Sequence, residues 1–186
     1  MLNIALQSIK YYLENNKIPS KNEIDIKDTA LLSKTGSLFV TIYKNGNIVG
    51  SSGNIKETLK NDNSPNSIVD ELILNSIFAL QDERFEKISL NDLDKIKIRI
   101  DVISKKLLNK DNSSIKNQIL NLNPAKSGII VIKNDYTKLS VILPNISPTL
   151  VNGQDLINTL SNKLDEEFIE ENYITYEVNS HILTNY

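Results

Sequence analysis

Hydrophobic residues recur along the chain with two different periods, and each period predicts a different kind of element. Before Pro19, apolar side chains return every three or four residues, at Leu2, Ala5, Leu6, Ile9, Tyr12 and Leu13. This spacing places them on one stripe of an amphipathic helix. From Leu38 to Tyr43 the period is two, so that alternate residues lie on opposite faces, which is typical of a β-strand.

An Asn45-Gly46 pair follows this strand and predicts a tight hairpin. Both central positions of a type I′ turn need positive φ, which asparagine and glycine tolerate best. The returning strand is predicted from Asn47 to about Ser51. It runs into the short segment Gly50-Ser51-Ser52-Gly53, which we call the glycine kink.

The rest of the chain alternates between predicted helices and strands. A second helix is predicted to start with Ser64 as its cap and Pro65 at its first position, and to end near Gln81-Asp82. A capping-box pattern at Ser89–Asp92 predicts a short helix. Alternating or short apolar runs predict strands at 96–103, 128–133, 138–143 and 173–178, and helical spacing predicts a helix at 155–164.

These elements together predict an α+β protein. Antiparallel strands with helices interspersed favour a mainly antiparallel sheet packed with helices. The 186 residues suffice for one compact unit, so we expect a single domain over 1–186 with two sub-lobes. The polar segment 105–123 has no clear period and is the best candidate for the junction between the sub-lobes.

Composition excludes several classes of function. The net charge is −2, the pI is near 5.5, and the basic and acidic residues are interspersed, so no broad basic face for nucleic acid is expected. The absence of cysteine excludes a thiol nucleophile, a thiolate metal site and a disulfide framework. With no long apolar run and no secretory leader pattern, we expect a cytoplasmic protein without a membrane partner, a metal or another cofactor.

Five segments, taken in order, resemble the AMMECR family, whose bacterial and archaeal members are also called protein A of the AmmeMemoRadiSam system. They are "FVTIYKNGNIVGSSGNI" (39–55), "NSIFALQDERF" (75–85), "LDKIKIRIDVIS" (93–104), "NPAKSGIIV" (123–131) and "VILP" (141–144). The most specific piece is "DERF", Asp82 to Phe85. The resemblance implies an α+β fold with two sub-lobes, an unestablished biochemical activity, and a radical-SAM enzyme and a Memo-type protein as companions.

The glycine kink departs from the family's pattern. The resemblance aligns the family's Arg-Gly-Cys-Ile-Gly signature, which lines a cleft, with Val49, Gly50, Ser51, Ser52 and Gly53, so only the two glycines match. Valine cannot supply the planar cationic fork with which arginine binds carboxylate or phosphate. A serine hydroxyl is a poorer nucleophile than a thiol unless a neighbouring base activates it.

Two further family features are altered elsewhere in the chain. The Lys-His-Gly triplet of many members is Lys126-Ser127-Gly128 here, and a late Lys-Ala-Gly is reduced to Lys163 followed by Leu164-Asp165. A cation such as Arg99 or Lys126 can compensate for the lost arginine if another segment brings it to the same space. The oligomeric state is left open by the sequence.

The candidate cleft that follows from the resemblance has members from three segments: Gly50, Ser51, Ser52, Gly53, Asp82, Arg84 and Lys126. Each has a structural alternative. The glycines can serve a bulge or a positive φ, and Asp82 and Arg84 can form an ion pair that ends the second helix. Lys126 can simply be solvated, and the only histidine, His181, has no acidic or nucleophilic neighbour in the sequence.

Three functional hypotheses follow. The first is a binding or accessory protein whose cleft recognises a partner protein or a small polar ligand, with a radical-SAM or Memo-type protein as the partner. The second is a small enzyme or enzyme subunit that uses Ser51 or Ser52 with Asp82, Arg84 and Lys126 on a small polar substrate. The third is a drifted paralogue whose largest exposed apolar patch lies away from the glycine kink.

Overall fold

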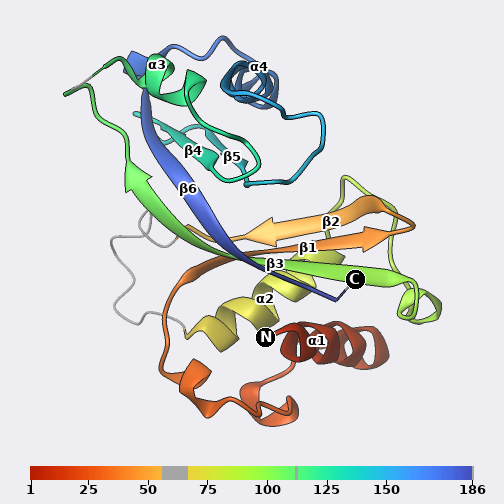
Figure 1. Ribbon diagram of the computed structural model, residues 1–186. Helices are drawn as coiled ribbons and strands as arrows, with labels where there is room; N and C mark the ends of the chain where they lie inside the picture. Colours follow the sequence, from red (N-terminus) through yellow and green to blue (C-terminus); the bar gives the residue numbers. More distant parts are fainter. Residues whose placement is uncertain (56–66, 112, 186) are drawn as a thin grey trace. The chain divides into compact units, whose positions relative to one another are not determined.

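The computed structural model describes residues 1–55, 67–111 and 113–185, and these residues form the predicted α+β fold (Figure 1). The described helices are α1 (Leu2–Asn15), α2 (Ile68–Leu80), α3 (Ile115–Leu120) and α4 (Gly153–Leu164). The described strands are β1 (Ser37–Lys44), β2 (Asn47–Gly53), β3 (Ile96–Leu107), β4 (Gly128–Lys133), β5 (Leu139–Ile142) and β6 (Tyr173–Thr184). Single 3₁₀ turns are η1 (Lys21–Glu23), η2 (Thr29–Leu32), η4 (Leu90–Asp92) and η5 (Glu170–Asn172).

Hydrogen bonds connect the strands in the order β2-β1-β3-β6-β4-β5. The pairs β1–β2, β1–β3, β4–β5 and β4–β6 are antiparallel, as the sequence predicted. The chain also divides into two compact units, Met1–Ile103 with His181–Tyr186, and Ser104–Ser180. The long strands β3 and β6 each contribute residues to both units, and the predicted junction at 105–123 stays a prediction.

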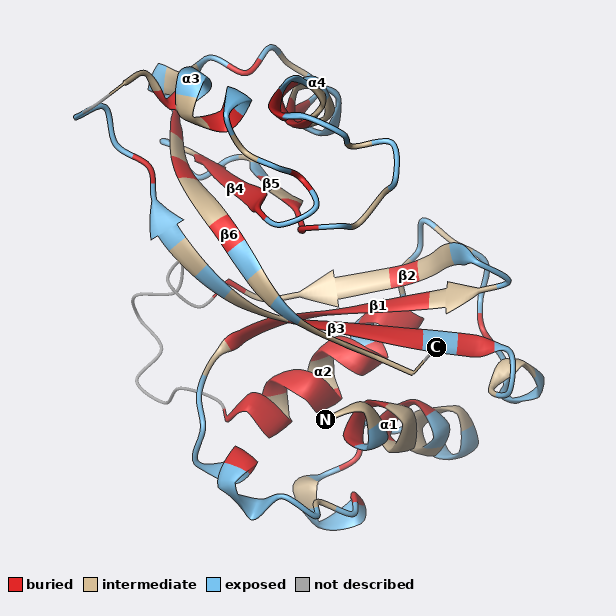
Figure 2. Cartoon of the chain, viewed as in Figure 1, coloured by how far each residue is buried: buried red, intermediate tan, exposed pale blue. Residues whose placement is uncertain are grey.

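The first unit packs α1 and α2 on one face of the β1–β3 ladder. Leu38, Val40 and Ile42 alternate along β1 and are fully buried in a core shared with both helices. Figure 2 shows this core as the red residues of β1 and α2. The predicted hairpin is confirmed, because Asn45 and Gly46 have φ of 53° and 82° between β1 and β2.

Helix α2 is positioned by a capping box. The backbone N–H of Asp70 donates to the Ser67 hydroxyl (3.3 Å), and the Asp70 carboxylate accepts from the Ser67 backbone N–H (2.8 Å). These contacts satisfy N–H groups that the first helical turn leaves unpaired. The helix therefore begins at Ile68, whereas the predicted cap Ser64 and the predicted first residue Pro65 lie outside the described residues.

The second unit packs α3 and α4 on the β4–β5–β6 ladder. Its core includes Ile129 and Val131 of β4, Ile119 of α3, and Leu156 and Leu160 of α4. The polar segment whose period was unclear contains the end of β3, which extends to Leu107, and the short α3. A helix of six residues with two buried side chains is too short to give a readable period.

One carboxylate ties the end of α4 to the sheet of this unit. Glu166 accepts from Lys133 Nζ (2.9 Å), Lys138 Nζ (2.9 Å) and the Tyr173 hydroxyl. Lys138 also donates to the carbonyl of Leu164 in the last turn of α4 (2.6 Å), where a cation complements the helix dipole. The Tyr173 hydrogen bond and then the two lysines lower the pKa of Glu166 to about 2.

We expect Glu166 to stabilise the fold at neutral pH and to lose this contribution in acid. Its folded pKa of about 2 lies below the ordinary value of 4.5, so its contribution is full above pH 5 and declines as the pH falls toward 2. Urea unfolding of wild type and Glu166→Gln between pH 7 and pH 3 measures this. The stability difference should shrink with falling pH, and a pH-independent difference would contradict the assignment.

Candidate functional site

The glycine kink lies on β2 where α2 crosses it, and alternate residues of the strand face one stripe of the helix. Glu71, Asn75 and Ala79 are four residues apart and form that stripe. The Ser52 hydroxyl donates to Asn75 Oδ1 (2.9 Å), and Asn54 Nδ2 donates to Glu71 Oε2 (3.2 Å). These contacts tie the end of β2 to the middle of α2.

Gly50 is the third residue of β2 that faces this stripe, and here the strand approaches α2 most closely. A Cβ atom on residue 50 would lie 1.9 Å from the carbonyl oxygen of Ala79. The strand also carries an irregularity here, because Ile42 pairs with Gly50 while Tyr43 pairs with Ile48, which leaves Val49 as the extra residue of a bulge. Packing against α2 therefore explains why residue 50 is a glycine, and a role of Gly50 in ligand binding stays a prediction.

Ser51 and Gly53 lie on the opposite face of β2. The hydroxyls of Ser51 and Thr41 are 3.3 Å apart across the β1–β2 ladder. A Cβ on residue 53 would lie 1.9 Å from the ring of Phe39, its cross-strand partner, so the phenylalanine ring occupies the space beside this glycine. Both glycines of the kink thus accommodate a neighbour within the first unit.

Asp82 and Arg84 form the ion pair that the sequence offered as a structural alternative, and Asp82 also contacts the kink. Arg84 Nε and Nη2 donate to the two oxygens of the Asp82 carboxylate at 2.8 and 2.6 Å. The same carboxylate accepts from the backbone N–H of Ser51 at 3.0 Å. The Arg84 hydrogen bonds, followed by the Ser51 N–H, hold the pKa of Asp82 below its usual value, so the carboxylate stays ionised and is a weak base.

The hydroxyls of the kink are not paired with a general base. The Ser51 hydroxyl contacts Thr41, and the Ser52 hydroxyl donates to an amide oxygen. No carboxylate or imidazole of the described residues accepts a hydrogen bond from either one. Activation of a serine requires such a base within about 3 Å.

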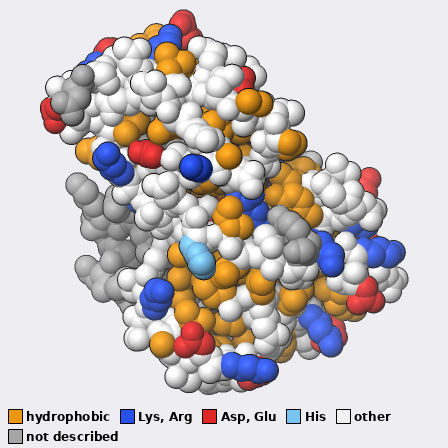
Figure 3. Space-filling view, in the orientation of Figure 1, with side chains coloured by type: hydrophobic (Ala, Val, Ile, Leu, Met, Phe, Trp, Pro, Cys, Tyr) orange, Lys and Arg blue, Asp and Glu red, His pale blue; other side chains and the backbone are white. Residues whose placement is uncertain are grey.

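The remaining candidate, Lys126, belongs to the second unit. It lies exposed in the turn before β4, and its ammonium forms no ion pair with any described residue. The neighbouring Ser127, at the position of the family's histidine, is buried and donates to Glu177 Oε1 (2.7 Å). His181 is exposed on β6 and is the pale blue side chain of Figure 3.

Arg99 lies on the same sheet face as Ser51, although Val49 replaces the family's arginine. Thr41 pairs with Ser51 on one side and with Arg99 on the other, so the three side chains form a row across β2, β1 and β3. The Arg99 guanidinium donates to both oxygens of Asp101, each at 2.7 Å. Both side chains are almost fully buried, so this cation is already neutralised within the strand.

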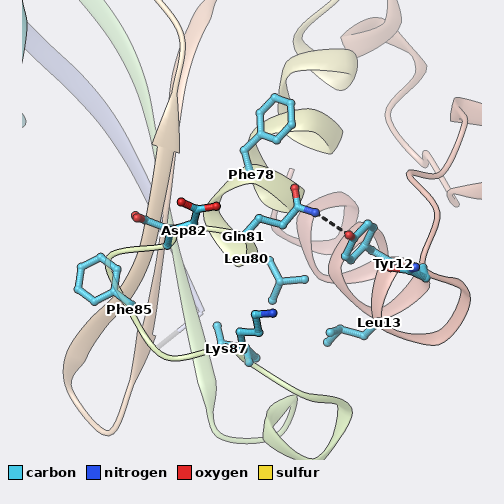
Figure 4. Close-up of a pocket in the computed structure, with 11 residues that line it drawn as sticks. Tyr12, Leu13, Phe78, Leu80, Gln81, Asp82, Phe85 and Lys87 are labelled. Carbon is cyan, nitrogen blue, oxygen red and sulfur yellow. Dashed lines mark hydrogen bonds between the residues drawn. The ribbon is translucent and has the colours of Figure 1, made fainter.

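Sequence reasoning missed an open hollow of about 790 Å³ in the first unit. The ends of α1 and α2 and the segment after α2 line it (Figure 4). We call it the α1–α2 hollow; its lining includes Tyr12, Leu13, Phe78, Leu80, Phe85 and Lys87. The DERF segment was singled out by the sequence, but the approach of α1 to it is a tertiary contact that periodicity does not predict. Asp82 belongs to this lining and links it to the kink.

Two features of the described residues concern other kinds of site. None of their helices combines the length and the apolar character that a bilayer crossing requires. Their His, Asp and Glu side chains form no cluster of three or more suited to a metal ion.

The sheet packed with helices defines an α+β protein. The AMMECR1 family model matches residues 2–179, and the chain belongs to this family. The crystal structure of an uncharacterized protein from Pyrococcus horikoshii, PH0010, has a TM-score of 0.78 with 18% sequence identity, and the similarity covers 98% of this chain and 88% of that one. At that identity the likeness concerns the fold. No curated protein matches the sequence.

Proposed function

We propose that this AMMECR1-family protein is a binding or accessory protein rather than an autonomous enzyme. The observation that carries the proposal is that the polar groups of the kink bind other parts of the same unit. Ser51 N–H is held by Asp82, the Ser52 hydroxyl by Asn75, and the Asp82 carboxylate by Arg84. Such an arrangement favours a rigid surface for recognition over a nucleophile with an adjacent base.

The partner that the family resemblance favours is a radical-SAM enzyme or a Memo-type protein. Arg84 is the best point of contact within the candidate cleft, because its side chain is 67% exposed. Its ion-pair partner Asp82 accepts from the Ser51 N–H of the kink and also lines the α1–α2 hollow. A partially exposed guanidinium at such a position is the type of side chain that frequently anchors protein interfaces.

Capture from native cell extract tests the proposal. Tagged wild type, Arg84→Gln and the neighbouring control Glu86→Gln are each shown to be folded by circular dichroism and then used as bait. Mass spectrometry identifies the captured proteins and small molecules. We expect a radical-SAM or Memo-type protein with wild type and with Glu86→Gln, and at least about a threefold loss with Arg84→Gln, the size of one exposed charge contact.

The enzyme alternative makes the opposite prediction. If the chain turns over a small polar substrate through Ser51, then Ser51→Ala abolishes that activity without changing the thermal transition. That result, or a wild-type bait that retains neither partner, would overturn the accessory role.

A further inference from the structure

The α1–α2 hollow has the size of a small-molecule site. Its volume of about 790 Å³ lies within the range of roughly 300–1,000 Å³ that is usual for ligand pockets. All of its lining residues belong to the first unit. It is also next to the kink, because Asp82 both lines the hollow and accepts from the backbone of Ser51.

Apolar side chains supply about half of the surface that lines the hollow. Phe78 is 49% exposed, so about half of a large aromatic side chain faces solvent at the end of α2. Leu80 lies toward Lys87 and Leu13, with Tyr12 on the α1 side, whereas the rings of Phe78 and Phe85 point away in different directions (Figure 4). An aromatic or branched apolar group bound here would remove this surface from water, which is the main source of affinity for small ligands.

The polar groups of the hollow favour an anion. The ammonium of Lys87 lies beside Leu80 (Figure 4) and forms no ion pair with any described residue. The Tyr12 hydroxyl accepts from Gln81 Nε2 (2.5 Å), and among the described residues nothing accepts its own proton. A cation and a hydroxyl donor are the groups that bind a carboxylate.

The lining also carries negative charge, which limits the charge of the ligand. Asp82 is neutralised by its bidentate contact with Arg84. Glu83 also lines the hollow and has no cationic partner among the described residues, so it disfavours a dianion such as phosphate. The charges therefore fit a ligand with a single negative charge.

We infer that the α1–α2 hollow binds a small monocarboxylic acid with an aromatic or branched apolar body. The apolar body packs against Leu13 and Leu80, and the carboxylate accepts from Lys87 and the Tyr12 hydroxyl. This inference rests on the proposed binding function and names the class of ligand for it.

The probe for a test is 4-phenylbutyrate, titrated into the full ¹⁵N-labelled chain. Its neutral isostere 4-phenylbutyramide lacks the charge, butyrate lacks the ring, and phenyl phosphate is a dianion. We expect changes in backbone amide chemical shifts that centre on the hollow. The Kd for 4-phenylbutyrate should be about threefold lower than for the amide, which is the effect of one partly exposed ion pair. Butyrate and phenyl phosphate should bind more weakly than 4-phenylbutyrate.

Two charge variants of the lining provide the matched comparison. Lys87→Gln should remove the difference between acid and amide, whereas Glu83→Gln should leave the affinity for the acid unchanged or improve it. Equal binding of acid and amide by wild type, equal losses with both variants, shifts centred elsewhere, or no binding of 4-phenylbutyrate would each overturn the inference.

This outcome is separable from the test of the proposed function. A chain that captures its protein partner but does not bind 4-phenylbutyrate retains the accessory role and loses only the ligand assignment. A chain that binds 4-phenylbutyrate through Lys87 but shows a turnover dependent on Ser51 retains the ligand site and loses the non-catalytic role.

Discussion

Replacing Gly50 with alanine is expected to lower the free energy of unfolding by about 2–3 kcal/mol, the usual cost of forcing extra volume into a close-packed interior. The added Cβ would lie 1.9 Å from the carbonyl oxygen of Ala79 and 3.0 Å from its carbonyl carbon. These are backbone atoms of α2, so they cannot move aside by a rotamer change. Either β2 or the end of the helix has to shift, which also disturbs the contact between Ser52 and Asn75. Urea unfolding followed by circular dichroism measures the effect.

Two other glycines of the same hairpin provide controls, because an added Cβ would meet a different obstacle at each of them. At residue 53 the added Cβ meets the buried ring of Phe39, a side chain rather than backbone, so Gly53→Ala should cost less than Gly50→Ala. At residue 46 nothing lies within 4 Å, but φ is +82°, so Gly46→Ala should cost only about 1–2 kcal/mol of backbone strain. If all three variants lose the same amount, the close approach of β2 to α2 is not what requires Gly50.

The same geometry determines which variants can test binding. A substitution of Gly50 perturbs packing whether or not the kink recognises a ligand, so its effect on binding has two explanations. Arg84, Lys87 and Glu83 are exposed, so their substitutions leave the core intact. For this reason the binding experiments use the charged side chains around the kink and the hollow.

Local signals in the sequence predicted most of the elements. The stripe from Leu2 to Leu13 matches α1, and Asn45-Gly46 matches the hairpin because its positive φ values depend on two adjacent residues alone. The start of α2 illustrates the limit. The capping box at Ser67 and Asp70, which the sequence also contains, starts α2 at Ile68, whereas Ser64 and Pro65 lie outside the described residues.

The candidate site was harder to predict, because it depends on contacts between distant segments. The resemblance named both Ser51 and Asp82, and the structure joins them by a hydrogen bond across 31 positions. The hollow was missed because Tyr12 and Phe78 come from different helices, and Phe78 lies off the buried stripe of α2. The row of Ser51, Thr41 and Arg99 likewise needs the register of three strands, which alternation alone does not fix.

The second large effect is expected at the Arg99–Asp101 pair. Arg99→Met should lower the free energy of unfolding by about 3–5 kcal/mol, because it removes the cation that contacts both oxygens of the buried Asp101 carboxylate. The Asp101 side chain is 0% exposed and that of Arg99 is 4% exposed, so water cannot replace the lost partner at either position. Urea unfolding at pH 7 measures this loss.

A double variant separates the cost of leaving one charge buried from the net contribution of the ion pair to the free energy of unfolding. Arg99→Met combined with Asp101→Leu removes both charges, so it should recover much of the stability that Arg99→Met loses, because replacing a whole buried pair by apolar groups is often nearly neutral. Lys10→Met is the exposed control: the Lys10–Glu14 pair spans 3.8 Å with side chains 62% and 46% exposed, and its loss should cost less than about 0.5 kcal/mol. A cost for Arg99→Met as small as that of Lys10→Met would contradict the assignment of a large stability effect to this buried pair.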